Sequence, residues 1–341
     1  MSTAGERQLV LVVGVGRSGT SLLSGMLGHL GFHIPQPEVK ADDTNPRGFG
    51  EPRWVVDFHT RLLRSRRVTV NDARPEAWAT MNATAADGAA RSELRDWLSG
   101  QLRESPALVV KDPRTVWFLP LWLRSASELG LPTAFVTMLR HPAEVVASAR
   151  RSYGDTLTTA TRACAWTNVI LETERATRGA RRAFVAYERL LADWPPEIRR
   201  VGALAGVPRL AAIERADHPA VDGFVDPTLH RNRVGWDELE VPERVRELAD
   251  DVWERLLALA GEGSAGADPA AFDAARSAYD ALYGEAEAIA QSSVIAARRR
   301  ARAPGSPGSA PPSLRVRLAR RVPARHRRRL RQAIAVLRPR S

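Results

Sequence analysis

One stretch near the N-terminus constrains the fold more than any other. The apolar run at residues 9–13 is typical of a strand that is buried on both faces. Glycines follow at positions 14, 16 and 19, and they allow the backbone to turn sharply and to approach a ligand closely. From residue 22 onward, apolar residues recur at helical spacing. A strand, a glycine turn and a helix N-terminus in succession predict a binding site for an oxyanion.

Two nucleotide-binding loops share this outline, and neither fits the sequence fully. A Walker A loop, G-x-x-x-x-G-K-[ST], matches residues 14–21 except that Thr20 stands where the lysine is required. A dinucleotide-binding loop, G-x-G-x-x-G, matches the three glycines, but it also needs a second strand that ends in Asp or Glu about 20 residues later. Residues 32–38 are too short and too rich in proline to form that strand. ATP hydrolysis and NAD binding are therefore disfavoured.

A second motif follows the strand predicted at residues 133–139. Arg140 leaves the end of that strand, and Ser148 lies eight residues later, in a helix that starts near Pro142. Residues 16–23 and 135–148 together resemble the 5′-phosphosulfate loop and the 3′-phosphate motif of the sulfotransferases that use 3′-phosphoadenosine 5′-phosphosulfate (PAPS). The stretch 45–51 resembles a segment of the bacterial sulfotransferases, and the stretches 111–114 and 187–193 resemble two further segments of the family. The resemblance covers about residues 7–260.

The resemblance implies a fold and a donor. The fold is α/β, a three-layer α/β/α sandwich around a parallel sheet, similar to that of P-loop NTPases. The donor co-substrate is PAPS, and no metal is required or indicated by the spacing of ligand-type residues. The residues implied in donor binding are Gly16, Arg17, Ser18, Gly19, Thr20, Ser21, Arg140, Ser148, Tyr187 and Arg231. Arg231 lies in a loop without the Arg-Lys-Gly triplet of the cytosolic animal enzymes, so a solvated turn is its alternative.

Three residues are assigned to catalysis: Arg17, Glu51 and Lys111. Glu51 is the expected general base for the acceptor hydroxyl, with Glu38 as the competing base and capping of the following helix as its structural alternative. Lys111 is one of only two lysines beside 48 arginines, and its ammonium can reach a phosphate or the transferring group. Its structural alternative is an ion pair with Asp112 or with a neighbouring loop.

Arg17 stands where many family members have lysine. Arginine keeps the positive charge but cannot act as a proton donor, so its expected role is electrostatic. It would neutralise the charge that develops on the leaving phosphate oxygen, together with the backbone N–H groups of residues 16–21.

The acceptor is expected to be a hydroxyl, with an amine as the alternative, on a glycan, lipid, small molecule or peptide tyrosine. Residues 64–90 show no clear period and are predicted to form a lid or insertion over the acceptor site. Four apolar residues are candidates for lining an acceptor pocket, with ordinary core packing as the alternative: Trp54, Phe58, Trp78 and Met81.

The positive charge of the chain is concentrated at one end. The net charge is +11, but fifteen arginines and no acidic residue follow from Arg298 onward, so residues 1–297 carry a net charge of −4. A nucleic-acid groove is therefore not expected on the catalytic body. The single cysteine, Cys164, excludes an intrachain disulfide, and no signal peptide or apolar span is visible. A cytoplasmic protein is expected, either free or peripheral to the membrane.

Three regions are predicted: a catalytic domain at residues 7–260, a helical extension at 261–303, and a Pro/Gly/Ser linker with an arginine-rich tail at 304–341. The apolar seam of the extension, within residues 269–297, either docks on its own domain or forms a homodimer. The tail either binds an anionic membrane surface or is a disordered solubilising segment. Two alternative functions stay open: a P-loop phosphotransferase for a small molecule, and a non-catalytic nucleotide-binding module docked to membrane.

Overall fold

The computed structural model describes residues 7–42, 45, 47–226, 228, 233–263 and 268–302. Four parallel strands form one sheet in the order β2-β1-β3-β4. Their bounds are β1 Gln8–Val13, β2 Ala107–Lys111, β3 Thr133–Leu139 and β4 Arg181–Ala186. The four strands that the sequence predicted are confirmed to within one or two residues.

The strands β1, β2 and β3 are buried on both faces, as their mainly apolar sequences require, whereas β4 begins with the exposed Arg181 and is buried from Ala183 onward. In β1, Leu9 and Leu11 contribute to one core cluster, whereas Val10 and Val12 contribute to the other. Because successive strand side chains point to opposite faces, one short apolar run supplies both cores.

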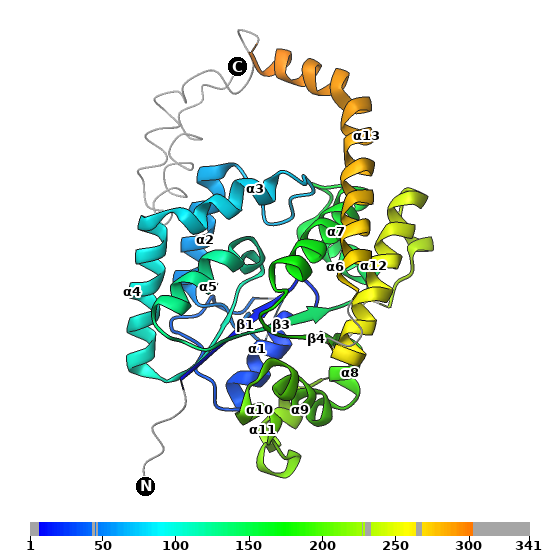
Figure 1. The fold of residues 1–341 in the computed structure, drawn as a ribbon. Helices are drawn as coiled ribbons and strands as arrows, with labels where there is room; N and C mark the ends of the chain where they lie inside the picture. Colours follow the sequence, from blue (N-terminus) through cyan, green and yellow to red (C-terminus); the bar gives the residue numbers. More distant parts are fainter. Residues whose placement is uncertain are drawn as a thin grey trace, which may run out of the picture. The chain divides into compact units, whose positions relative to one another are not determined.

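Helices cover the two faces of the sheet (Figure 1). One face packs against α2 (Arg53–Arg66), α3 (Ala77–Asn82), α4 (Gly88–Glu104), α5 (Leu119–Glu128), α7 (Thr159–Ala176) and α12 (Glu243–Glu262). The other face packs against α1 (Thr20–His29), α8 (Tyr187–Ala192), α9 (Trp194–Ala205), α10 (Pro208–Ala211) and α11 (Pro219–Phe224). The fold is a three-layer α/β/α sandwich of the P-loop type, as predicted.

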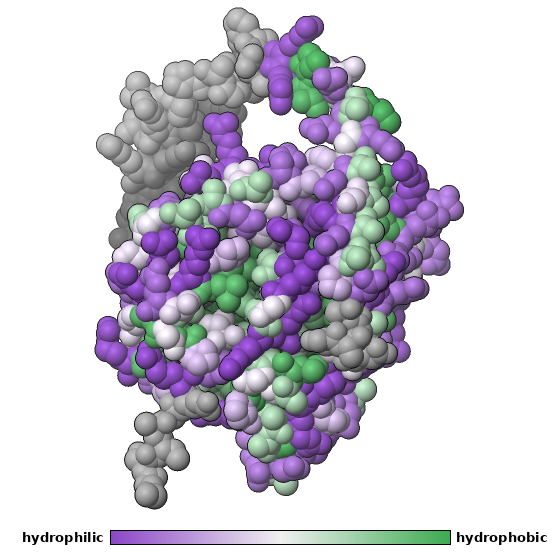
Figure 2. All heavy atoms as spheres, viewed as in Figure 1, coloured by the Kyte–Doolittle hydropathy of each residue, from purple (hydrophilic) through white to green (hydrophobic). Residues whose placement is uncertain are grey.

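Two further helices and four short 3-10 helices complete the described part of the chain. They are α6 (Pro142–Tyr153), α13 (Pro269–Arg302) and the 3-10 helices η1 (Ala83–Ala86), η2 (Pro113–Phe118), η3 (Arg215–Asp217) and η5 (Trp236–Glu238). Hydrophilic residues predominate on the face of the molecule that Figure 2 shows, because most large apolar side chains are enclosed in the core clusters. None of the helices in the described part of the chain is both long enough and apolar enough to cross a membrane.

The position of β1 determines where a ligand can bind. The chain leaves β1 to form β2 on one side, then returns past β1 to form β3 on the other side. The crevice at the carboxyl ends of β1 and β3 is therefore a topological switch point, which is where open α/β sheets bind ligands. The glycine loop that follows β1 lies at this crevice.

The compact unit of the chain runs through Tyr283, so it extends past residue 260, where we expected the catalytic domain to end. Phe272 and Tyr279 of α13 are buried in the core cluster that contains Leu9. The predicted seam is thus covered within its own unit over this first part. The rest of α13 is helical to Arg302, and residues 284–300 are exposed, with Ile289 84% exposed.

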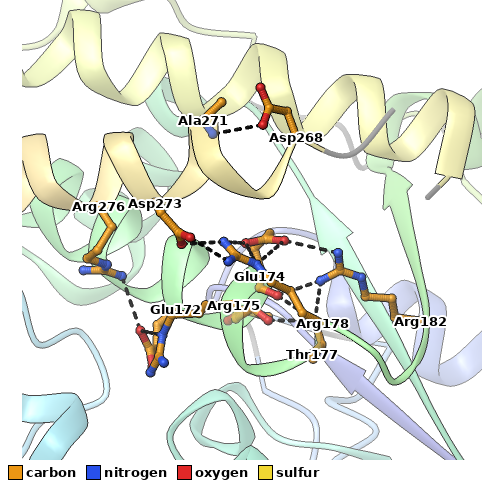
Figure 3. Close-up of polar contacts among 11 residues, drawn as sticks. Glu172, Glu174, Arg175, Thr177, Arg178, Arg182, Asp268, Ala271, Asp273 and Arg276 are labelled. Atoms are coloured by element: carbon orange, nitrogen blue, oxygen red, sulfur yellow. Dashed lines mark hydrogen bonds and ion pairs between the residues drawn. The ribbon is translucent and has the colours of Figure 1, made fainter. Parts of the chain in front are cut away.

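Charged contacts attach the first part of α13 to α7 and β4 (Figure 3). Glu174 of α7 is fully buried and accepts hydrogen bonds from Arg178 and Arg182. Arg178 also forms an ion pair with Asp273 of α13 at 2.8 Å. A buried carboxylate is stable only when it is paired and hydrogen-bonded, so removing either arginine would be costly. The network therefore holds α13 in place.

A second set of contacts connects α13 to the loop at residues 72–74. Arg276 donates a hydrogen bond to Asn168 Oδ1 at 2.7 Å, and Asn168 Nδ2 donates to the carbonyl oxygens of Asp72 and Arg74. The hydroxyl of Tyr279 donates to the carbonyl oxygen of Ala73. The loop is thereby held by side chains from α7 and α13.

The linker and tail predicted at residues 304–341 lie outside the described residues, so their proposed membrane contact stays a prediction.

Candidate active site

The glycine loop after β1 adopts a backbone that its sequence dictates. Gly14 and Gly19 have φ angles of 136° and 94°, which residues with a Cβ rarely adopt. A Cβ on Gly14 would lie 2.8 Å from the carbonyl oxygen of Met138, and one on Gly19 would lie 2.3 Å from the ring of Tyr187. Glycine is therefore needed at both positions for the loop to pack against β3 and α8.

Helix α1 begins at Thr20, directly after this loop. Gly19, the residue that precedes the helix, has no side chain with which to cap the first N–H groups. Those N–H groups and the positive end of the helix dipole favour an anion at this place. The loop thus has the form of the predicted oxyanion site.

A cavity of about 380 Å³ opens beside this loop, a size within the roughly 300–1,000 Å³ range of small-molecule sites. Nine of the implied residues line it together with Glu51: Gly16, Arg17, Gly19, Thr20, Ser21, Lys111, Arg140, Ser148 and Tyr187. Ser18 does not; it is buried next to the loop, where its N–H donates to the carbonyl oxygen of Val15. Arg231 lies outside the described residues.

The two predicted anion motifs meet in the structure. Arg17 Nε donates a hydrogen bond to Ser148 Oγ at 3.1 Å, and Arg140 Nη1 donates to the carbonyl oxygen of Arg17 at 3.4 Å. Within the part of the chain that the structure describes, Arg17 has no carboxylate partner. Its charge is therefore available to a ligand anion in the cavity.

The guanidinium of Arg140 is held on two sides. Its Nε donates to Glu144 Oε2 at 2.7 Å, and its plane lies over the ring of Tyr187, 5.0 Å from the ring centroid. Arg140, Glu144 and Tyr187 are all buried. Stacking and ion pairing together fix the direction of the guanidinium, which is how arginine gains geometric selectivity for phosphate or carboxylate groups.

Lys111 and Glu51 form a buried ion pair. Lys111 Nζ lies 2.6 Å from Glu51 Oε1, and the two residues are only 2% and 8% exposed. The ammonium also donates to Ser21 Oγ at 3.1 Å and to the carbonyl oxygen of Phe49 at 3.2 Å. With three acceptors for its three hydrogens, Lys111 connects the start of α1 to the candidate base.

Burial raises the pKa of Glu51 above its ordinary value of 4.5, and the charge of Lys111 opposes this effect. Glu51 precedes Pro52, the N-cap of α2, but its carboxylate contacts Lys111 and does not cap that helix. The competing candidate, Glu38, does not line the cavity, and its carboxylate accepts a hydrogen bond from Gln36 on the surface. The structure thus brings Glu51 and Lys111 to the cavity, and not Glu38.

Asp112, next to Lys111, has different partners. Its carboxylate is fully buried and accepts hydrogen bonds from His59 Nδ1 at 2.8 Å and from Arg114 Nη1 at 2.7 Å. Burial alone would raise its pKa, but the His59 hydrogen bond and the Arg114 charge outweigh burial and lower the pKa to about 2. The alternative in which Lys111 pairs with Asp112 is therefore wrong, whereas the alternative pairing with a neighbouring loop is observed, because Lys111 contacts Phe49 and Glu51.

His59 was not singled out from the sequence, and the structure determines its tautomer. The indole N–H of Trp122 donates to His59 Nε2 at 3.0 Å, so Nε2 must accept and the proton sits on Nδ1, facing Asp112. Burial lowers the pKa of His59. A neutral histidine with both nitrogens occupied orients Asp112, and through it Arg114, which lines the cavity.

The apolar lining of the cavity differs from the prediction. Trp54, Phe58, Trp78 and Met81 all lie in or against the core cluster and do not line the cavity. The aromatic residues that do line it are Phe49, Tyr153, Trp166, Tyr187 and Phe224. Of the segment 64–90, only Val70 and Asn71 reach the cavity, because α3 and η1 pack into the core. The predicted lid is thus mainly a packed insertion.

Comparisons with known proteins identify the family of this chain. The sulfotransferase domain of the olefin synthase from Synechococcus PCC 7002 is a structural neighbour with 17% sequence identity and a TM-score of 0.40; the match covers 75% of this chain and 98% of that domain. No curated protein matches the sequence significantly. The family model described as "Sulfotransferase family" matches residues 9–211, from β1 to α10, more than half of the chain. With its loop, its second anion motif and this match, the chain belongs to the sulfotransferase family.

Proposed function

We propose that this protein transfers a sulfuryl group from PAPS to a hydroxyl group of an acceptor. The family supports sulfuryl transfer, and the anion loop and the second motif support a donor that carries phosphate groups at two positions. The observation that carries the proposal is the Lys111 ammonium, which contacts both Ser21 at the anion loop and the carboxylate of Glu51. One cation thereby joins the site of the leaving group to the expected base.

The residues that line the cavity fit the donor in charge and shape. Gly16 and Gly19 of the loop line the cavity, and the N–H groups that open α1 suit a phosphosulfate. The Arg140 guanidinium and the Ser148 hydroxyl suit a 3′-phosphate, and the Tyr187 ring suits the adenosine. When bound, the donor supplies a sulfuryl group linked to phosphate through an anhydride oxygen.

Glu51 acts on the acceptor in this proposal. Its carboxylate takes the proton of the acceptor hydroxyl, whose oxygen forms the new bond to sulfur on the side opposite the breaking bond to the phosphate oxygen. The products are a sulfate ester and adenosine 3′,5′-bisphosphate, so atoms and charge balance. Burial raises the pKa of Glu51 toward the neutral pH range, and a carboxylate of higher pKa is the stronger base.

Arg17 and Lys111 stabilise the charge that moves during transfer. Negative charge builds on the phosphate oxygen as its bond to sulfur breaks, and the Arg17 guanidinium and the N–H groups of residues 16–21 neutralise it. Lys111 holds Glu51 in position and places a positive charge beside the transferring group. Arginine does not give up a proton in proteins, so the leaving group departs as an anion.

Calorimetry with adenosine 3′,5′-bisphosphate, ATP and NAD tests the donor. The bisphosphate is expected to bind, and incubation with labelled PAPS and cell extracts is expected to yield a labelled sulfate ester. Saturable binding of ATP or NAD with no heat from the bisphosphate would overturn the proposal. Magnesium-dependent consumption of ATP would favour a phosphotransferase instead.

A further inference from the structure

Arg162 of α7 is a buried cation of the cavity that the proposed chemistry does not use. It lines the cavity and is only 5% exposed. Its Nη2 donates to the carbonyl oxygen of Gly154 at 2.7 Å, and its Nε donates to that of Leu157 at 3.3 Å. Arginine has five N–H donors, so these two contacts leave both hydrogens of Nη1 and one of Nη2 for a further partner.

Counter-ions distinguish Arg162 from most other cations of the cavity. Four cations each have a carboxylate within 3.1 Å: Arg47 has Asp226, Lys111 has Glu51, Arg114 has Asp112 and Arg140 has Glu144. Two cations, Arg17 and Arg162, have no carboxylate partner among the residues that the structure describes. Arg17 belongs to the anion loop and is accounted for by the donor. Arg162 is left over.

A buried guanidinium without a counter-ion is costly, because the charge has lost its hydration and gained no opposite charge. Buried apolar neighbours increase the effect, since Val145 of α6 and Trp166 of α7 are buried and line the same cavity. Trp166 lies one helical turn after Arg162 and therefore on the same face of α7. An anionic group that enters the cavity would be strongly attracted to this position.

We propose that Arg162 binds an anionic group of the acceptor, so that the substrate is an acidic molecule that carries both the reacting hydroxyl and a carboxylate or a phosphate or sulfate ester. This inference rests on the proposed sulfuryl transfer. The donor does not need Arg162, because its phosphates already have the anion loop, Arg17, Arg140 and Ser148. The end of the Arg162 fork can hold a carboxylate through two hydrogen bonds, and the aromatic side chains suit the apolar part of such an acceptor.

The charge of the natural product tests the inference, and this test does not require that the acceptor be identified first. The labelled sulfate ester that wild-type protein forms from cell extracts is isolated and analysed by electrophoresis at several pH values and by mass spectrometry. A product with at least one acidic group besides the new sulfate is expected, and its titration distinguishes a carboxylate from a phosphate or sulfate ester. A product whose only charge is the new sulfate would overturn the inference. Binding of adenosine 3′,5′-bisphosphate without any labelled product would count against the proposed transfer.

Matched ligands and variants test Arg162 itself. With adenosine 3′,5′-bisphosphate bound, hydroxy acids and phosphomonoesters are titrated beside their neutral methyl esters or parent alcohols. Wild-type protein is expected to prefer the anionic partner by roughly 10- to 100-fold, the range of one or two charged hydrogen bonds. Arg162→Gln should abolish this preference and Arg162→Lys should keep part of it. If no anionic ligand of the series is preferred, or if Arg162→Gln leaves the preference intact, the inference is wrong.

Two controls separate recognition from structure. Arg150 of α6 is exposed and pairs with Asp155 at 3.1 Å, in the loop whose carbonyl oxygens Arg162 contacts. Arg150→Gln therefore perturbs that loop on its solvent side, and it should leave the preference unchanged. If the role of Arg162 were only structural, Arg162→Gln would lower the affinity for anionic and neutral ligands equally. Affinity for adenosine 3′,5′-bisphosphate should be the same in Arg162→Gln and in wild type. Weaker bisphosphate binding would assign Arg162 to the donor and would overturn the inference while supporting the proposed function.

Discussion

Replacing Lys111 by methionine measures how the buried ion pair affects the pKa of Glu51 and, through it, the free energy of unfolding. Methionine has a similar length but no charge, so the Glu51 carboxylate loses the cation that now lies 2.6 Å away. Removing one partner of a buried pair typically destabilises a protein by about 3–5 kcal/mol when the other partner stays charged. Glu51 has an alternative, because it can bind a proton and become neutral.

The size of the effect should therefore depend on pH. Burial already raises the pKa of Glu51 above 4.5, and Lys111 is the main group that opposes this. Without Lys111 the folded-state pKa rises further, so the folded state binds a proton that the unfolded state releases. The free energy of unfolding is then highest below pH 4.5 and falls by up to about 1.4 kcal/mol per pH unit until the folded-state pKa is reached. Between pH 5 and pH 8 we expect Lys111→Met to lose roughly 2–4 kcal/mol more than wild type.

Urea unfolding at pH 5, 6, 7 and 8 measures this difference, and the double variant Glu51→Gln/Lys111→Met is the matched control. The double variant has no titrating group at this place, so its loss of stability should be the same at every pH. Glu51→Gln alone should cost about 1–3 kcal/mol, since Lys111 keeps Ser21 and Phe49 as acceptors. It should also lower sulfuryl transfer by roughly 10²–10⁴-fold, the usual contribution of a general base. An equal loss at pH 5 and pH 8 in Lys111→Met would refute the reasoning.

Three further substitutions test the anion site. Arg17→Ala should abolish sulfuryl transfer and leave the unfolding free energy within about 1 kcal/mol of wild type, because a half-buried cation that lines the cavity is lost without opening the core; retained activity would remove its central role. Arg140→Ala should weaken adenosine 3′,5′-bisphosphate by about 1.5–3 kcal/mol in calorimetry, the contribution of a charged hydrogen bond, and unchanged affinity would rule out the 3′-phosphate assignment. Gly19→Ala should destabilise the fold by about 1–3 kcal/mol in urea, since its Cβ would lie 2.3 Å from a ring at positive φ. Gly16→Ala, with its nearest contact at 3.7 Å, is the control and should have little effect.

The anion site could be predicted because its signals are local. The run of residues 9–13 encodes a buried strand, and glycine, arginine and serine follow at spacings that strand-to-helix turns require. Ser148 follows Arg140 by eight positions, which places that serine two turns into α6, within reach of the first loop. One contact of the second motif was not predicted: Ser148 accepts a hydrogen bond from Arg17 of the first loop.

That Lys111 does not pair with Asp112 could also have been deduced from the strand. Lys111 ends β2 and Asp112 continues in extended conformation, so the two side chains point to opposite sides. One therefore contacts Glu51 and the other contacts His59. Which residues meet them is set by tertiary packing across 50 to 60 positions of sequence, and no periodicity reports that.

The acceptor side carried the weakest signals. The sequence around Trp54, Trp78 and Trp166 does not distinguish a tryptophan of the core from one of a pocket. Only Trp166 of these three lines the cavity. Arg162 is one of 48 arginines, and no pattern in the neighbouring sequence indicates that its side chain is buried. Its position follows from the way in which α7 packs against α6, which only the folded chain shows.

The contacts that Asn168 makes have a consequence for any truncation of the chain. This amide holds the carbonyl oxygens of Asp72 and Arg74 and is itself held by Arg276, some 200 positions downstream of that loop. A polypeptide cut after residue 260 would lose Arg276 and the buried Tyr279, and with them the support of the loop that brings Val70 and Asn71 into the cavity. A cut after Tyr283 would keep all of these contacts. The shape of the cavity thus depends on a helix that lies outside residues 9–211, the part of the chain that the family model matches.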